Sequence, residues 1–108
     1  MTENPILDTD SYKASHFLQY PPNTDATFFY VESRGGAHDR TLFFGLQSIL
    51  LRALSRRITP AHVREASEFF AAHGEPFNEA GWLDIATRLE GRLPIRIRAV
   101  PEGTVVPT

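Results

Sequence analysis

Apolar side chains between residues 45 and 91 recur three times with the period of an α-helix, and this pattern constrains the fold more than any other feature. In the first stretch, from Gly45 to Ser55, the apolar residues form one stripe at i, i+3, i+4, i+7 and i+8: Leu46, Ile49, Leu50, Ala53 and Leu54. Arginines lie off that stripe. The spacing therefore predicts an amphipathic helix that buries one face.

The two following helices have start and stop signals. Thr59 before Pro60 predicts a helix start, because a threonine side chain accepts from free N–H groups and proline suits the first helical position. Gly74 is a suitable residue to end that helix. A third helix is predicted from Asn78, ended by Gly91, with an apolar stripe of Trp82, Ile85, Ala86 and Leu89.

A shorter helix is predicted near the N-terminus, over residues 9–18. Thr9 or Asp10 is expected to cap it with a side-chain oxygen. It must end before Pro21, because a residue that precedes proline avoids the helical region.

Four stretches have the composition of β-strands. Residues 26–33 are rich in aromatic and β-branched side chains on both faces, which predicts a strand covered on both sides. Residues 93–100 alternate apolar and charged side chains, which predicts a half-buried strand. Residues 41–44 are a short strand or an extended approach to the next helix, and 104–106 begin another strand. The predicted class is α+β, with a short N-terminal helix, a few mostly antiparallel strands and three amphipathic helices.

Composition excludes several functions. Eleven basic and thirteen acidic residues give a formal charge of −2, so we expect no nucleic-acid partner. The chain has no cysteine, which excludes disulfides and thiolate chemistry, and its four histidines lack metal-ligand spacing. No apolar run reaches the roughly 20 residues needed to cross a bilayer, and no secretory signal is present, so we expect a cytoplasmic protein without a membrane partner.

The length of 108 residues indicates one domain. The final residues, 105–108, are extended and mostly apolar, and a strand there needs a partner for its backbone groups. We therefore expect a fragment, or one half of a larger unit.

Candidate ligand contacts gather on the first helix, where Asp10, Tyr12, Lys13 and His16 lie close in sequence. Tyr12 and His16 are four residues apart and share a helix face. A plainer interpretation is a capped amphipathic helix, in which Asp10 is the cap, Tyr12 a core residue and Lys13 solvated.

A second candidate is Arg34, which precedes two glycines. Such a turn can form an anion nest of N–H groups beside a phosphate-binding arginine, or simply a tight turn with an exposed arginine. The residues alone thus indicate an α+β module with a small-anion or small-aromatic contact near its first helix, and they define no reaction.

Several motifs resemble, in order, the N-terminal part of the nicotinamide phosphoribosyltransferases, within the nicotinate/nicotinamide phosphoribosyltransferase family. They are Thr9-Asp10-Ser11-Tyr12-Lys13 with the following His16 and residues 19–24, Glu32-Ser33-Arg34, Phe44-Gly45-Leu46-Gln47, residues 77–82, residues 93–97 and residues 99–103. The loop of residues 35–41 looks shorter than in many members of the family.

This resemblance implies a function. Family members make nicotinamide mononucleotide and pyrophosphate from nicotinamide and phosphoribosyl pyrophosphate in NAD salvage, as homodimers with active sites at the subunit interface. It implies that residues 1–108 are an N-terminal domain, truncated before an α/β barrel that carries the catalytic residues. No catalytic residue and no metal or cofactor site is then expected in this segment, and the segment alone should be inactive. Mg²⁺ and ATP are implied for the full-length enzyme.

The resemblance also implies roles for three residues, all in substrate binding. Tyr12 is expected to reach into the partner subunit's site and contact the nicotinamide ring, Asp10 to lie near the carboxamide, and Arg34 to bind in the phosphate region. The alternative is a free-standing, non-catalytic module that binds a full-length subunit or a nucleotide.

Overall fold

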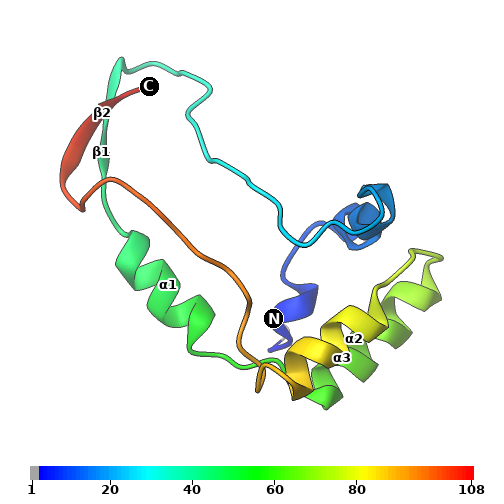
Figure 1. Ribbon diagram of the computed structural model, residues 1–108. Coiled ribbons are helices and arrows are strands. Elements are labelled where there is room, and N and C mark those ends of the chain that lie inside the picture. The colour runs from blue at the N-terminus through cyan, green and yellow to red at the C-terminus, as the bar shows by residue number, and fades with distance from the viewer. Residues whose placement is uncertain (1–2) are drawn as a thin grey trace.

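The computed structural model describes residues 3–108. It is a small α+β arrangement of short 3₁₀ helices, three α-helices and one two-stranded sheet. The elements in chain order are η1 (Pro5–Leu7), η2 (Ser11–Gln19), β1 (Arg40–Phe43), α1 (Leu46–Leu54), α2 (Pro60–Ala72), α3 (Glu79–Thr87) and β2 (Thr104–Pro107). Two groups of elements result: η1, η2, α2 and α3 lie on one side, and the sheet with α1 lies on the other (Figure 1).

The core lies where α2, α3 and η1 meet. Its fully buried apolar residues are Ile6, Ile58, Val63, Ala66 and Phe70. The ring of Phe70 stacks on that of Phe77, with centroids 5.3 Å apart, and so joins α2 to the segment before α3. Ala14 of η2 packs against this small core, which thereby positions η2.

Both start signals in this region are confirmed. The Thr59 side chain accepts a hydrogen bond of 3.2 Å from the His62 N–H, and the His62 ring accepts one of 3.1 Å from the Thr59 N–H. Asn78 caps α3 by accepting from the Gly81 N–H at 3.0 Å. The third helix ends at Thr87, earlier than predicted, and a turn carries the chain on to Gly91.

Asn4 anchors the N-terminal segment on α2. Its side chain is 1% exposed, and its amide group donates to the His62 carbonyl at 2.8 Å and to the Glu65 carboxylate at 2.9 Å. Its side-chain oxygen accepts from the Ile6 N–H at 3.1 Å. A polar residue is therefore satisfied inside the core, as burial requires.

The sheet pairs β1 with β2 in antiparallel register, from Arg40 opposite Pro107 to Phe43 opposite Thr104. This confirms the two short strands expected at residues 41–44 and 104–106. Next to the sheet, the carboxylate of Glu102 accepts hydrogen bonds from the N–H groups of Gly45 at 2.8 Å and Gln47 at 2.9 Å. Glu102 thus caps the N-terminus of α1, where free N–H groups and the helix dipole favour an anion.

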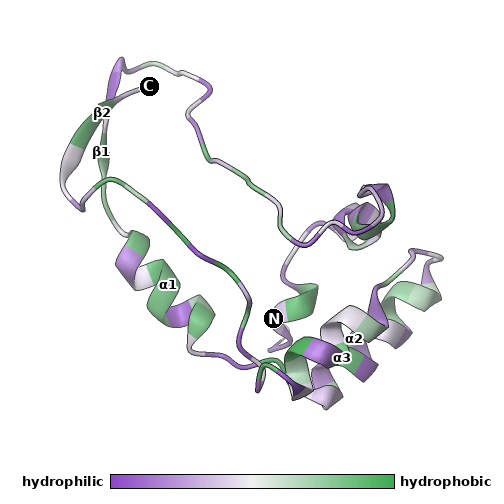
Figure 2. Cartoon of the chain, in the orientation of Figure 1, coloured by the Kyte–Doolittle hydropathy of each residue, from purple (hydrophilic) through white to green (hydrophobic). Residues whose placement is uncertain are grey.

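Two predicted strands are wrong. Residues 26–33 and 93–100 are extended, but neither joins a β-ladder among the described residues. They form the two long segments that link the sheet to the helices (Figure 1), and apolar and polar residues follow each other along the segment before β2 (Figure 2). The composition is that of strands, but a strand needs a neighbour for its N–H and C=O groups, and nothing within residues 3–108 provides one.

The first helix also differs from its prediction. It spans Ser11–Gln19 and is a 3₁₀ helix, and Asp10 takes the N-cap position without a side-chain capping hydrogen bond.

Within residues 3–108, none of the helices combines the length and the apolar character that crossing a membrane requires.

Candidate functional site

Helix η2 lies beside the C-terminal end of α2 (Figure 1). Ala14 packs on the core, and the Ser11 hydroxyl hydrogen bonds to Nε2 of His73, the C-cap residue that follows α2. No residue of η2 is fully buried. The helix is therefore held along one side and presents its other side chains outward.

Four of the sequence-predicted residues come together at the start of η2. The Asp10 carboxylate lies 3.4 Å from Lys13 Nζ, and Lys13 Nζ lies 6.0 Å from the centre of the Tyr12 ring. Tyr12 and His16 make an edge-to-face contact with ring centroids 5.4 Å apart. A carboxylate, an ammonium group and two rings thus share one short stretch of surface.

Tyr12 is 59% exposed, so the interpretation of this tyrosine as a core residue is wrong. The expectation that the Asp10 side chain caps the helix is also wrong, because that carboxylate pairs with Lys13 instead. An exposed ring and an exposed carboxylate remain free to meet a ligand, since neither is used to stabilise the core.

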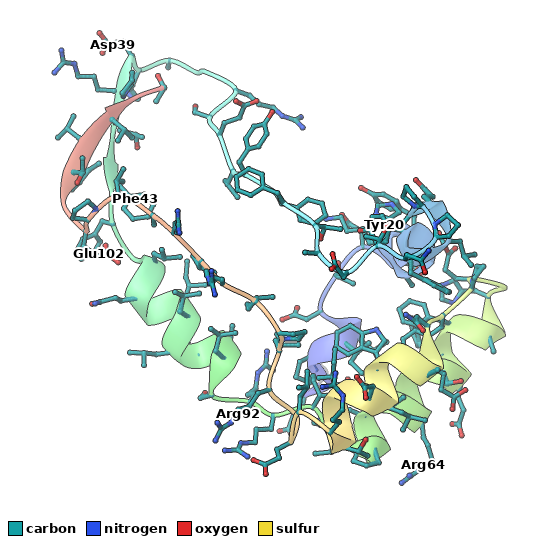
Figure 3. The ribbon with its side chains drawn as sticks, in the orientation of Figure 1. Tyr20, Asp39, Phe43, Arg64, Arg92 and Glu102 are labelled. Atoms are coloured by element: carbon teal, nitrogen blue, oxygen red, sulfur yellow. The ribbon has the colours of Figure 1, made fainter. Side chains whose placement is uncertain are left out.

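Arg34 lies apart from this group. It is exposed and belongs to the extended segment between Tyr20 and Asp39, the two residues that Figure 3 labels at either end of it. Gly35 has φ +84°, and its N–H donates to the Ser33 hydroxyl at 3.1 Å, so the local structure is a turn with an exposed arginine. Among the described residues, the structure does not bring Arg34 to Asp10 or Tyr12.

Two shallow hollows lie elsewhere. One of about 280 Å³ is bordered by Arg40, Val105, Val106 and Pro107. The other, of about 410 Å³, lies along α1 and is bordered by Gln47, Leu50, Leu51, Leu54 and Ser55. Neither is lined by Asp10, Tyr12 or Arg34, each of which is exposed.

On α3, two hydrogen bonds from Arg88, of 2.7 and 2.8 Å, lower the pKa of Asp84. Within residues 3–108, no group of three or more His, Asp or Glu side chains could hold a metal ion.

The fold is that of a small α+β domain with these exposed groups along one edge. Its sequence matches the profile of the family described as nicotinamide phosphoribosyltransferase, N-terminal domain, over residues 4–97. The chain belongs to this family.

Two curated relatives have the same name. A nicotinamide phosphoribosyltransferase of Xanthomonas campestris pv. campestris (strain 8004) is 70% identical over 98% of this chain and 23% of its own length. One of Acinetobacter baylyi (strain ATCC 33305 / BD413 / ADP1) is 26% identical over 95% of this chain and 24% of its own length. The chain thus spans about a quarter of the length of these relatives.

Sequence reasoning missed the pairing of Ser11 with His73. A signal was present, because His73 follows Phe70 by three residues and Ala66 by seven, and so shares the core-facing side of α2. The partner could not be found that way, since the sequence does not show which segment covers the end of α2.

Proposed function

We propose that this chain is the N-terminal domain of a nicotinamide phosphoribosyltransferase. The reaction transfers the phosphoribosyl group of phosphoribosyl pyrophosphate to nicotinamide, which gives nicotinamide mononucleotide and releases pyrophosphate. It belongs to NAD salvage in the cytoplasm. The observation that carries this proposal is the 70% identity, across 98% of the chain, to a protein of that name. The family match over residues 4–97 supports it independently of that one relative.

Tyr12 and Asp10 are proposed to bind the nicotinamide. Its ring is flat and electron-poor, so the exposed Tyr12 ring is a suitable partner. The Asp10 carboxylate accepts from the carboxamide NH₂ and would repel the carboxylate of nicotinate, which gives specificity for the amide. Lys13 contacts Oδ2 of Asp10 and leaves Oδ1 for the ligand.

Arg34 is proposed to bind phosphate oxygens through charge-assisted hydrogen bonds. Its separation from η2 suits a site that is completed by other parts of a homodimer, in which η2 reaches the partner subunit. The transition state of such a transfer has oxocarbenium character, so positioning and neutralisation of the pyrophosphate matter more than a nucleophilic side chain. The segment accordingly binds substrate and contributes no catalytic residue.

The family resemblance implies Mg²⁺ and ATP for the full-length enzyme. Among residues 3–108, no group of three or more His, Asp or Glu side chains could hold a metal ion.

A chimera tests the proposal. Residues 1–108 replace the matching N-terminal segment of the Xanthomonas campestris relative, and formation of nicotinamide mononucleotide from nicotinamide and phosphoribosyl pyrophosphate is measured. The chimera should turn over, whereas the relative without its N-terminal segment and the isolated 108-residue chain should not. A folded chimera without turnover, or turnover by the isolated chain, would contradict the proposal.

A further inference from the structure

The imidazole of His73 is held on both of its nitrogen atoms. Nδ1 lies 2.9 Å from the Phe69 carbonyl oxygen, and Nε2 is hydrogen bonded to the Ser11 hydroxyl. The ring also contacts the rings of Phe69 and Phe70, with centroids 5.2 and 5.8 Å away. Contacts with Phe69 and Phe70 of α2 therefore hold the His73 ring in place independently of η2.

The Phe69 carbonyl can only accept, so Nδ1 must donate to it. In the neutral ring, Nε2 is then an acceptor and the Ser11 hydroxyl donates to it. Nε2 of His73, at the end of α2, thus accepts a hydrogen bond from Ser11, the first residue of η2, which is 62 positions away in the chain.

Helix η2 has little else to orient it. It is a nine-residue 3₁₀ helix, a form whose hydrogen-bond geometry is poorer than that of an α-helix and in which runs of more than three or four residues are uncommon. Apart from Ala14 on the core, its side chains are exposed or half-buried, and the hydroxyl of its other serine, Ser15, bonds within the helix to the Tyr12 carbonyl at 2.9 Å. Among the described residues, Ser11 is the member of η2 whose side chain hydrogen bonds to another element.

Ser11 stands between Asp10 and Tyr12 in the chain, so the bond to His73 acts on the backbone that carries both. We propose that Ser11 and His73 are positioning residues, which clamp η2 on the end of α2 and so set the direction of Asp10 and Tyr12. The inference that this improves nicotinamide binding rests on the proposed function. The clamp itself does not, and it can be tested separately.

The first test uses a lysine-specific protease on the 108-residue chain. Lys13 is its one lysine and lies inside η2, so cleavage there reports directly on opening of the helix. Losing one hydrogen bond should speed cleavage about three- to tenfold in Ser11→Ala. His73→Phe, which keeps the ring contacts and removes the acceptor, should have the same effect. The double variant should be cut no faster than either single variant, because one bond is lost in all three.

Two matched variants complete this test. Ser15→Ala removes a hydroxyl of the same helix that does not reach α2, and Ser11→Thr keeps the donor, so both should be cut at the rate of the unchanged chain. Equal rates for Ser11→Ala and Ser15→Ala would overturn the clamp. Additive effects of Ser11→Ala and His73→Phe, or fast cleavage of the unchanged chain, would overturn it as well.

The second test uses the chimera with Xanthomonas campestris. Ser11→Ala and His73→Phe should raise the KM for nicotinamide about three- to tenfold with little change in kcat, because binding and not chemistry is affected. Ser11→Thr should restore the KM. An inactive unchanged chimera would refute the proposed function and leave the protease result standing. An active chimera whose KM for nicotinamide is unchanged by both substitutions would overturn the positioning role alone.

Discussion

The carbonyl oxygen of Gly91 accepts a hydrogen bond of 2.9 Å from the N–H of Ile58, and this links the turn after α3 to the segment before α2. The approach is so close that a Cβ on Gly91 would lie 2.4 Å from the Ile58 carbonyl oxygen. Gly91 also has φ +79°, a conformation that other residues rarely adopt. Glycine is therefore required here both by space and by backbone conformation.

Gly91→Ala should lower the free energy of unfolding by about 2–4 kcal/mol, because it adds a clash with backbone to the strain of a positive φ. The matched control is Gly74→Ala, at φ +73° with nothing within 4 Å of the added Cβ, which should lower it by about 1 kcal/mol. Urea unfolding of the two variants measures the difference. Equal losses would show that the contact with Ile58 is not as tight as the geometry implies.

Glu102→Ala should destabilise α1. It removes the acceptor of two hydrogen bonds from the first turn of α1 and a negative charge at the positive end of its dipole, which together contribute about 1–2 kcal/mol. Glu102→Gln should lose less, since one side-chain oxygen remains. Urea unfolding and amide exchange at Gln47 measure both variants, and unchanged exchange in Glu102→Ala would exclude the cap.

The ion pair of Asp84 and Arg88 should make the stability of α3 fall at acidic pH. The hydrogen bonds from Arg88 lower the pKa of Asp84 in the folded chain. The unfolded chain then binds more protons at low pH, so the contribution of the pair is complete above about pH 4 and is lost as the pH falls below it. Asp84→Asn should flatten this part of the profile, measured by thermal unfolding between about pH 2 and 6. An identical fall at acidic pH in Asp84→Asn would contradict the assignment.

The exposed apolar segment at residues 28–31 should promote self-association of the isolated chain. Phe29 is 74% exposed on extended backbone whose N–H and C=O groups have no ladder partner among the described residues, and such an edge recruits other strands. Phe29→Lys should therefore reduce light scattering of the 108-residue chain. Leu51→Lys is the matched control, because Leu51 is 73% exposed on a helix whose backbone groups are paired. Equal effects of the two substitutions would mean that exposure alone drives association.

Local signals in the sequence were enough to predict where α2 and α3 begin. Thr59 and Asn78 accept hydrogen bonds from backbone N–H groups three residues further on, and Pro60 has no N–H to leave unpaired at the first helical position, so their roles follow from neighbouring sequence alone. The short strands expected at residues 41–44 and 104–106 also follow from local composition, but their pairing with each other does not.

Properties that depend on distant partners could not be predicted. Residues 26–33 have the composition of a covered strand, but composition does not supply the neighbour. Asp10 has the side chain of a helix cap, yet an ion pair with Lys13 competes for its carboxylate. Glu102 caps a helix that begins more than fifty residues earlier in the chain, and nothing in its neighbouring sequence indicates that contact.

The most direct test of the account is the KM for nicotinamide of the chimera when Tyr12 is changed. Tyr12→Ala should raise it about tenfold by removing the ring contact, and Tyr12→Phe, which keeps the ring, should stay close to the unchanged chimera. Tyr20→Ala, at the other end of η2, is the matched control and should leave the KM unaltered. An active chimera in which Tyr12→Ala changes neither KM nor kcat would remove Tyr12 from the site and contradict the claim that η2 contributes to substrate binding.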